Sequence, residues 1–163
     1  MDPKILQRNT QMHIREATRD DLPAILALYA QPALDDGRCL AAGQAENIFR
    51  TMQAYPYYKI FVAEEDSQAV GTFALLIMEN LGHLGKPSGL VEDVAVSPSH
   101  QRQGIGKAMM LYAMEKCRER GCYKMALSSN LIRKEAHTFY ESIGFIRHGY
   151  SFVVPLEIQQ RPA

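Results

Sequence analysis

Hydrophobic and polar residues follow two periods along this chain, one typical of helices and one typical of strands. Leu22, Ile25, Leu26 and Tyr29 recur on one face of a predicted helix, whereas Met12, Ile14 and Glu16 alternate as in a strand. In chain order, the pattern predicts a strand from residue 12, a helix including 22–29, a helix at 45–54, strands at 59–64, 70–78 and 90–96, a helix at 104–120, a strand at 123–128, a helix at 134–143 and a strand at 145–156. This order predicts a mixed sheet with helices on both faces.

Length and composition indicate an ordinary globular protein. The 163 residues suit one domain, which we expect at 12–158, with 1–11 as a flexible N-terminal extension and 159–163 as a C-terminal tail. Lysine plus arginine and aspartate plus glutamate number 18 each, so the net charge gives no reason to expect a nucleic acid or an anionic membrane as partner. No apolar run approaches the ~18 residues of a membrane span.

The cysteines and histidines suggest neither a disulfide framework nor a metal site. Cys39, Cys117 and Cys122 are odd in number and lack CxxC spacing, which is typical of reduced thiols in a cytoplasmic protein. The histidines show no H-E-x-x-H or comparable spacing, so we expect no metal.

The run Gln101-Arg102-Gln103-Gly104-Ile105-Gly106 carries the strongest chemical signal. It follows an apolar strand and opens an amphipathic helix, so unpaired backbone N–H groups and the positive end of the helix dipole point to one place. Gly104 and Gly106 have no Cβ and would let a diphosphate approach the backbone, with Arg102 and Lys107 nearby. This geometry suits the pyrophosphate of a nucleotide or of coenzyme A.

Two signatures in this order resemble those of the GNAT N-acetyltransferases. Val94-Ala95-Val96-Ser97-Pro98 followed by the glycine-rich run fits the family's acetyl-CoA signature, Q/R-x-x-G-x-G/A after a strand. His137-Thr138-Phe139-Tyr140-Glu141-Ser142-Ile143-Gly144-Phe145, with Ala136 before it, fits the second signature, A-x-x-F-Y-x-x-x-G-F. Leu127-Ser128-Ser129-Asn130 stands where the family ends its fifth strand. The resemblance extends from Met12 to about Leu156, and within the superfamily the cofactor half is similar to glucosamine-phosphate and polyamine acetyltransferases.

The resemblance implies the GNAT fold, an α/β (α+β) fold with a mixed, mostly antiparallel sheet, splayed central strands and helices on both faces. It also implies acetyl-CoA as cofactor, with its pantetheine arm along the fourth strand and its pyrophosphate on the start of the long helix. The residues assigned to the cofactor in this way are Val94, Ala95, Val96, Arg102, Gln103, Gly104, Ile105, Gly106, Lys107, Asn130, Lys134 and Phe139.

Acetyl transfer sets three chemical requirements, and the chain offers residues for them. An alkylamine with a pKa near ~10.4 must lose a proton, the oxyanion needs a donor such as a backbone N–H at a strand bulge, and the departing thiolate gains from a proton. Tyr140 matches the tyrosine that the family uses as proton donor. Glu92 and Asp93 interrupt an apolar strand, and we expect Glu92 as a water-mediated base with Asp93 as a substitute or as an anchor for the substrate ammonium. Strand alternation places them on opposite faces, and either one alone could equally be a surface or loop-tethering carboxylate.

The charges of the loops suggest what kind of acceptor the protein uses. The leading hypothesis is a primary amine of a small molecule, because acidic residues and basic ones such as Arg38 both occur in the loops that build the family's acceptor pocket. Two alternatives stay open: acetylation of a protein or peptide at lysine or an N-terminal amine, and a catalytically silent module that only binds acetyl-CoA. By analogy with relatives, a homodimer through the C-terminal strands is also expected.

Overall fold

The computed structural model describes residues 12–32, 34–154 and 156 of the chain. They form two compact units, one ending at Leu127 and the other beginning at Ser128, and each unit is described by itself. The expected extension at 1–11 and the expected tail at 159–163 lie outside the described residues, and the single domain at 12–158 stays a prediction.

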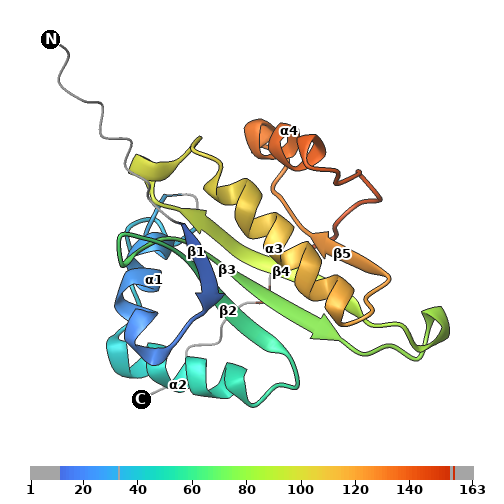
Figure 1. Ribbon diagram of the computed structural model, residues 1–163, viewed down its shortest axis with the longest axis horizontal. Helices are drawn as coiled ribbons and strands as arrows, with labels where there is room; N and C mark the ends of the chain where they lie inside the picture. Colours follow the sequence, from blue (N-terminus) through green and yellow to red (C-terminus); the bar gives the residue numbers. More distant parts are fainter. Residues whose placement is uncertain (1–11, 33, 155, 157–163) are drawn as a thin grey trace, which may run out of the picture. The chain divides into compact units, whose positions relative to one another are not determined.

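The first unit is built on a five-stranded sheet with the strands in sequence order (Figure 1). The strands are β1 (His13–Glu16), β2 (Tyr58–Glu65), β3 (Gln68–Met78), β4 (Ser88–Val96) and β5 (Lys124–Leu127). Neighbouring strands from β1 to β4 are antiparallel, and only β4 and β5 run parallel. A parallel pair needs a crossover, and helix α3 (Ile105–Glu119) supplies it. The mixed, mostly antiparallel sheet is therefore confirmed.

Helices cover both faces of this sheet, as the element order predicts (Figure 1). The helices α1 (Leu22–Tyr29) and α2 (Ala42–Gln53) pack on one face, and α3 packs on the other against β3, β4 and β5. Short 3-10 turns occupy Arg19–Asp21, His83–Gly85 and Pro98–His100. The α1/α2 face holds one core cluster, which consists of Ala17, Leu22, Ile25, Phe49, Ile60, Val62 and Ala74.

The α3 face of the sheet is packed with aromatic and sulfur-containing side chains. Phe61 and Phe73 stack with ring centroids 5.1 Å apart, and Tyr112 of α3 meets Phe61 edge-on at 5.4 Å. Met109 is fully buried and lies against Gly71 of β3, where a Cβ would come within 2.9 Å of its sulfur. The close approach of α3 to β3 fixes where the helix begins, and therefore where the glycine-rich turn lies.

The second unit contains α4 (Lys134–Ser142), which ends before Gly144 as the sequence predicts. The strand expected at 145–156 is wrong for the residues that are described here, since 145–154 and 156 carry no strand. A β-rich composition is not sufficient for a strand, because strand formation also depends on a backbone partner and a packed face. Phe145 N–H instead donates to Tyr140 O at 3.1 Å and closes the end of α4. Within the described ranges, no helix is both long and apolar enough to cross a bilayer.

Candidate functional site

The free edge of β4 is the first element of the candidate site. β4 pairs with β5 only from Ser88 to Val91, opposite Lys124 to Leu127, whereas β4 itself continues to Val96. The last five residues of β4 therefore extend past the end of β5. In the described part of the first unit, this stretch has strand neighbours on its β3 side only.

The ladder alternation shows which backbone groups face this free edge. Ser97 N–H donates to Val70 O at 2.8 Å, so the groups of alternate residues face β3 and those of Val94 and Val96 face the other way. The carbonyl of Val96 accepts the side-chain amides of Gln31 and Gln101, each at 3.2 Å. The Val96 carbonyl is therefore already hydrogen-bonded, and the groups that face a ligand lying along β4 are the N–H of Val96 and the backbone groups of Val94.

The glycine-rich turn and the start of α3 form the second element. Gly104 is the N-cap of α3 with φ +87°, and Arg102 has φ +60°, both in the left-handed region that favours glycine. The first N–H groups of a helix have no partner inside it, and no side chain of the described residues caps this end. A Cβ at Gly104 would meet no atom within 4 Å, so open space lies in front of this backbone. Arg102, Gln103 and Lys107 are all exposed around it.

A β-bulge at Asp93 forms the third element. Ala74 pairs with Glu92 and Thr72 pairs with Ala95, so the single residue between them in β3 faces two residues of β4. Asp93 itself has φ +53°, a strained conformation for a residue with a side chain. Such a bulge re-aims side chains, and here it breaks the alternation that predicted opposite faces for Glu92 and Asp93.

The charges of both carboxylates act on tyrosines that pack against the core cluster of the α1/α2 face. Glu92 is in register with Ala74, a member of the core cluster on that face, and Asp93 lies near Tyr29 of α1. Tyr58 of β2 lies near both carboxylates, and each raises the pKa of its phenol. The extra residue of the bulge interrupts the simple alternation of β4 at this point, and which of the two acids faces the acceptor stays a prediction.

We define the carboxylate cluster as Asp35, Glu92 and Asp93. All three side chains are acidic. Desolvation and the charge of Asp93 raise the pKa of Glu92, and desolvation and the charge of Asp35 raise the pKa of Asp93. Within the described ranges, no basic side chain contributes to either shift. Burial raises the pKa of Tyr29 and Tyr58 as well, so both phenols stay protonated at neutral pH.

Sequence reasoning missed the tyrosines of this cluster. Tyr29 fits the apolar face of α1, and Tyr58 lies at the start of a β-rich run, so both look like core residues. Only the register of β2 against β3 brings Tyr58 beside the bulge, and a register is not visible in a single sequence. The charge of Asp35, an acidic residue of the loop after α1, also acts on Asp93, and this proximity depends on the fold in the same way.

The second unit holds the remaining predicted residues. Asn130 Oδ1 accepts the N–H of Ile132 at 3.1 Å, and its backbone carbonyl accepts His137 Nε2 at 2.9 Å, so Asn130 organises the turn before α4. Lys134 is exposed at the first residue of α4. Phe139 and Tyr140 have ring centroids 5.1 Å apart. The contacts of these residues with a cofactor stay a prediction.

Tyr140 combines a packed ring with a protonated phenol. Its ring meets Phe145 edge-on at 5.5 Å, which fixes the orientation of the side chain. Burial raises the pKa of the phenol, and the charge of Arg133 opposes the shift. Because the pKa is raised above 10.0, the proton is retained throughout the neutral range.

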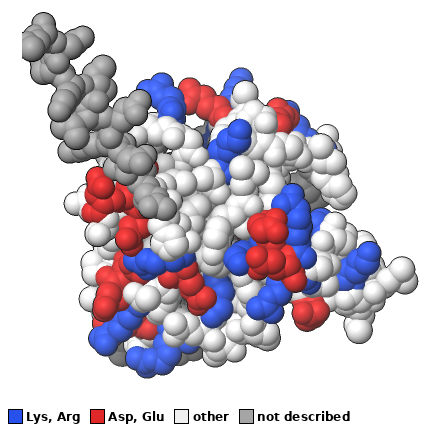
Figure 2. Space-filling view, viewed as in Figure 1, with Lys and Arg blue, Asp and Glu red and all other residues white. Residues whose placement is uncertain are grey.

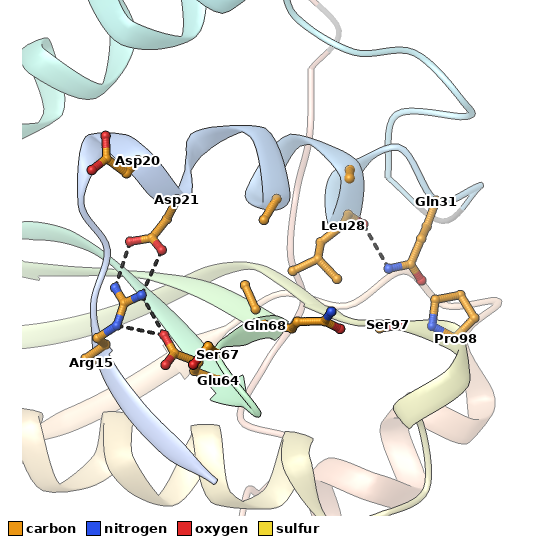
Figure 3. Close-up of a pocket in the computed structure, with 13 residues that line it drawn as sticks. Arg15, Asp20, Asp21, Leu28, Gln31, Glu64, Ser67, Gln68, Ser97 and Pro98 are labelled. Carbon is orange, nitrogen blue, oxygen red and sulfur yellow. Dashed lines mark hydrogen bonds and ion pairs between the residues drawn. The ribbon is translucent and has the colours of Figure 1, made fainter.

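A pocket of about 530 Å³ lies along α1, from Arg15 at one end to Gln31 and Pro98 at the other, and is shown in Figure 3. Arg15 in this pocket is already neutralised, since it contacts Asp21 at 2.7 Å and Glu64 at 2.7 Å. The pairing with Arg15 lowers the pKa of Asp21 to about 2. Neither Glu92 nor Asp93 lines this pocket, so it is separate from these two carboxylates, although Ser97 and Pro98 at one end of it directly follow β4. On the face drawn in Figure 2, acidic and basic side chains are interspersed.

Comparison with known proteins agrees with this geometry. Residues 15–145 match the model of the Acetyltransferase (GNAT) family. A solved structure of a putative acetyltransferase from Agrobacterium tumefaciens is 31% identical, with a TM-score of 0.83 over 88% of this chain and 99% of that one. Glucosamine 6-phosphate N-acetyltransferase of Trypanosoma brucei brucei is 36% identical over 55% of this chain and 59% of its own length. Aminoalkylphosphonate N-acetyltransferase of Salmonella typhimurium is 26% identical over 88% of this chain and 90% of its own.

The chain spans between half and three fifths of the length of the first two curated relatives that it matches. The family match, in contrast, covers 131 of the 163 residues, counted from 15 to 145, and it contains both the free edge of β4 and the start of α3. The chain belongs to the acetyltransferase (GNAT) family.

Proposed function

We propose that this protein transfers the acetyl group of acetyl-CoA to a primary amine of a small molecule. The observation that carries this proposal is the continuation of β4 past the end of β5, followed by the 3-10 turn Pro98–His100, the glycine-rich turn and the start of α3. An extended ligand with a diphosphate at one end fits such an arrangement, because an exposed strand edge can pair with amides and a helix start binds phosphate.

Acetyl-CoA would supply the acetyl thioester, and GNAT acetyltransferases use it in general. In the first unit, the backbone of Val94 to Val96 would bind its amides. The N–H groups from Gln103 to Lys107 would bind its phosphates, with Arg102 adding positive charge. In the second unit, we assign Asn130, Lys134 and Phe139 to cofactor contacts on the resemblance alone.

The carboxylate cluster would bind the ammonium form of the acceptor and take its proton. A base must be ionised, and a raised pKa means that the ionised form is lost at a higher pH on acidification than for an ordinary carboxylate. We assign the base to Glu92, acting through water, with Asp93 as the ammonium anchor. Backbone N–H groups at the bulge would stabilise the developing negative charge.

We assign Tyr140 as the donor of a proton to the departing thiolate. Its phenol is protonated at neutral pH because burial raises its pKa, and its ring is held between Phe139 and Phe145. A homodimer and a cytoplasmic location are further proposals that rest on the resemblance and on the three unpaired cysteines.

The acceptor class is supported by the charges of the site and by the named relatives. A wholly acidic cluster favours a cationic amine, and Arg38, whose Nε donates to Asp35 O at 3.1 Å, adds one positive charge at the same loop. This combination suits a small amine that also carries an anionic group. The names of the relatives from Trypanosoma and Salmonella state such acceptors, a sugar phosphate amine and an aminoalkylphosphonate.

A panel of amines incubated with acetyl-CoA tests this proposal through the release of free thiol. The panel contains glucosamine 6-phosphate, an aminoalkylphosphonate, an aminoglycoside, a polyamine and a lysine peptide. We expect turnover with a small amine and at least ~10-fold lower kcat/KM with the peptide, a difference of about 1.4 kcal/mol in transition-state binding.

The control variant is Glu92→Gln combined with Asp93→Asn, which removes the negative charges and keeps the size of both side chains. It should bind acetyl-CoA but release little thiol. Preferred turnover of the peptide would favour the protein acetyltransferase instead. Binding of acetyl-CoA without turnover of any amine would favour a silent binding module.

A further inference from the structure

Two cysteines that the proposed chemistry does not use meet at the end of α3. Cys117 lies in the last turn of the helix and is 4% exposed, and Cys122 follows the helix and is partly exposed. Gly121, between them, has φ +69°. All these residues belong to the first unit.

The hydrogen bonds that end α3 explain why the two thiols face each other. Cys122 N–H donates to Cys117 O at 2.9 Å, and Gly121 N–H donates to Arg118 O at 2.9 Å. These two bonds, together with a left-handed residue at Gly121, define a Schellman motif, in which the side chains of the third-last helical residue and of the second residue after the C-cap commonly contact each other. Here, those two positions are both cysteine.

The surroundings hold this pair in place from both sides. Tyr123 N–H donates to Pro87 O at 3.0 Å, which ties the residue after Cys122 to the start of β4. The sulfur of Cys117 lies on Gly89 of β4, where a Cβ would come too close to it. Gly89 is still paired with Met125 of β5, so the thiols lie at the closed end of the β4–β5 pair.

We propose that Cys117 and Cys122 form a dithiol that peroxide oxidises reversibly to an intramolecular disulfide. The Cys122 thiolate attacks one oxygen of hydrogen peroxide, which breaks the O–O bond, releases hydroxide and leaves a sulfenic acid on Cys122. The Cys117 sulfur then attacks the Cys122 sulfur, the S–S bond forms and the S–OH oxygen leaves as water. In total, two thiols and one hydrogen peroxide give one disulfide and two waters.

The roles of the two cysteines follow from their environments. Burial raises the pKa of both thiols, and the interaction between them raises the pKa of Cys117 further and partly offsets the shift of Cys122. Burial is the main cause that raises the pKa of Cys117 to about 12, whereas Cys122 is the more accessible sulfur. Cys122 is therefore the residue that peroxide reaches first, and Cys117 is the resolving thiol.

The test uses the full chain with Cys39→Ser, which removes the exposed third cysteine and prevents disulfides between molecules. The folded protein is treated with hydrogen peroxide, the excess is destroyed, and the free thiols are alkylated after denaturation. We expect two free thiols before treatment and none after it, a monomer about 2 Da lighter, and recovery of both thiols with dithiothreitol.

The control variants are Cys117→Ala and Cys122→Ala in the same background. Without its partner, Cys122 should be oxidised further to the sulfinic acid, about 32 Da heavier, and Cys117 alone should stay reduced. The proposal is overturned if the protein with both cysteines keeps two free thiols. It is equally overturned if that protein gains the sulfinic acid at Cys122, since Cys117 then fails to resolve it.

Discussion

Tyr140→Phe should lower kcat by roughly 10- to 1000-fold while the affinity for acetyl-CoA changes little, because it removes the proposed general acid and leaves the binding groups in place. The substitution removes one hydroxyl and keeps the aromatic ring, so the contacts of Tyr140 with Phe139 and Phe145 survive. Steady-state kinetics with an accepted amine gives kcat, and calorimetry gives the affinity.

Tyr150→Phe is the matched control for this substitution. It makes the same chemical change in the same unit, at a side chain that is 92% exposed, and should leave kcat unchanged. If Tyr140→Phe also left kcat unchanged, Tyr140 would have no part in proton transfer. Equal losses in both variants would point to a general effect of the substitution on the second unit.

Replacement of Gly104 should weaken acetyl-CoA binding by roughly 10- to 100-fold, or about 1.4 to 2.8 kcal/mol. Two causes act together. A Cβ here projects into the open space in front of the helix start, and φ +87° is strained for any other residue, most of all for a β-branched one. Gly104→Ala and Gly104→Val should therefore give a graded loss, measured by calorimetry.

Gly121→Ala and Gly121→Val separate the binding effect from backbone strain. Gly121 has φ +69° and also has nothing within 4 Å of a Cβ, so its replacement brings a similar cost to stability. It lies at the other end of α3, and the affinity for acetyl-CoA should not change. Unaltered affinity in the Gly104 variants would remove the helix start from the binding site.

The sequence predicts elements whose signal is local, and the bounds of the structure agree closely with them. The helix predicted at 104–120 is observed at Ile105–Glu119, and the strand predicted at 70–78 is observed at Gln68–Met78. The spacing of apolar residues and the glycines at the ends of elements are both signals that depend on neighbouring residues alone. The predicted strand at 145–156 failed in the described residues because a strand requires partners that its own sequence does not encode.

The site was predicted in part, and the features that were missed depend on contacts between elements that are distant in the sequence. Glu92 and Asp93 were predicted because charged residues interrupt an apolar strand, but the bulge at Asp93 is revealed only by the pairing of β3 with β4. Tyr58 comes near them through the register of β2 against β3, and Tyr29 through the packing of α1 on the sheet. The Cys117 and Cys122 pair had a local signal that sequence reasoning missed. Cys122 follows Cys117 by five residues at the end of a predicted helix, and Gly121 stands directly before Cys122.

A crystal structure of the protein with bound coenzyme A tests the central claim most directly. We expect the diphosphate within hydrogen-bond distance, about 2.7–3.2 Å, of the N–H groups at the start of α3, and the pantetheine amides paired with the backbone of Val94 and Val96. A diphosphate bound elsewhere on the protein, with the start of α3 left in water, would contradict the account.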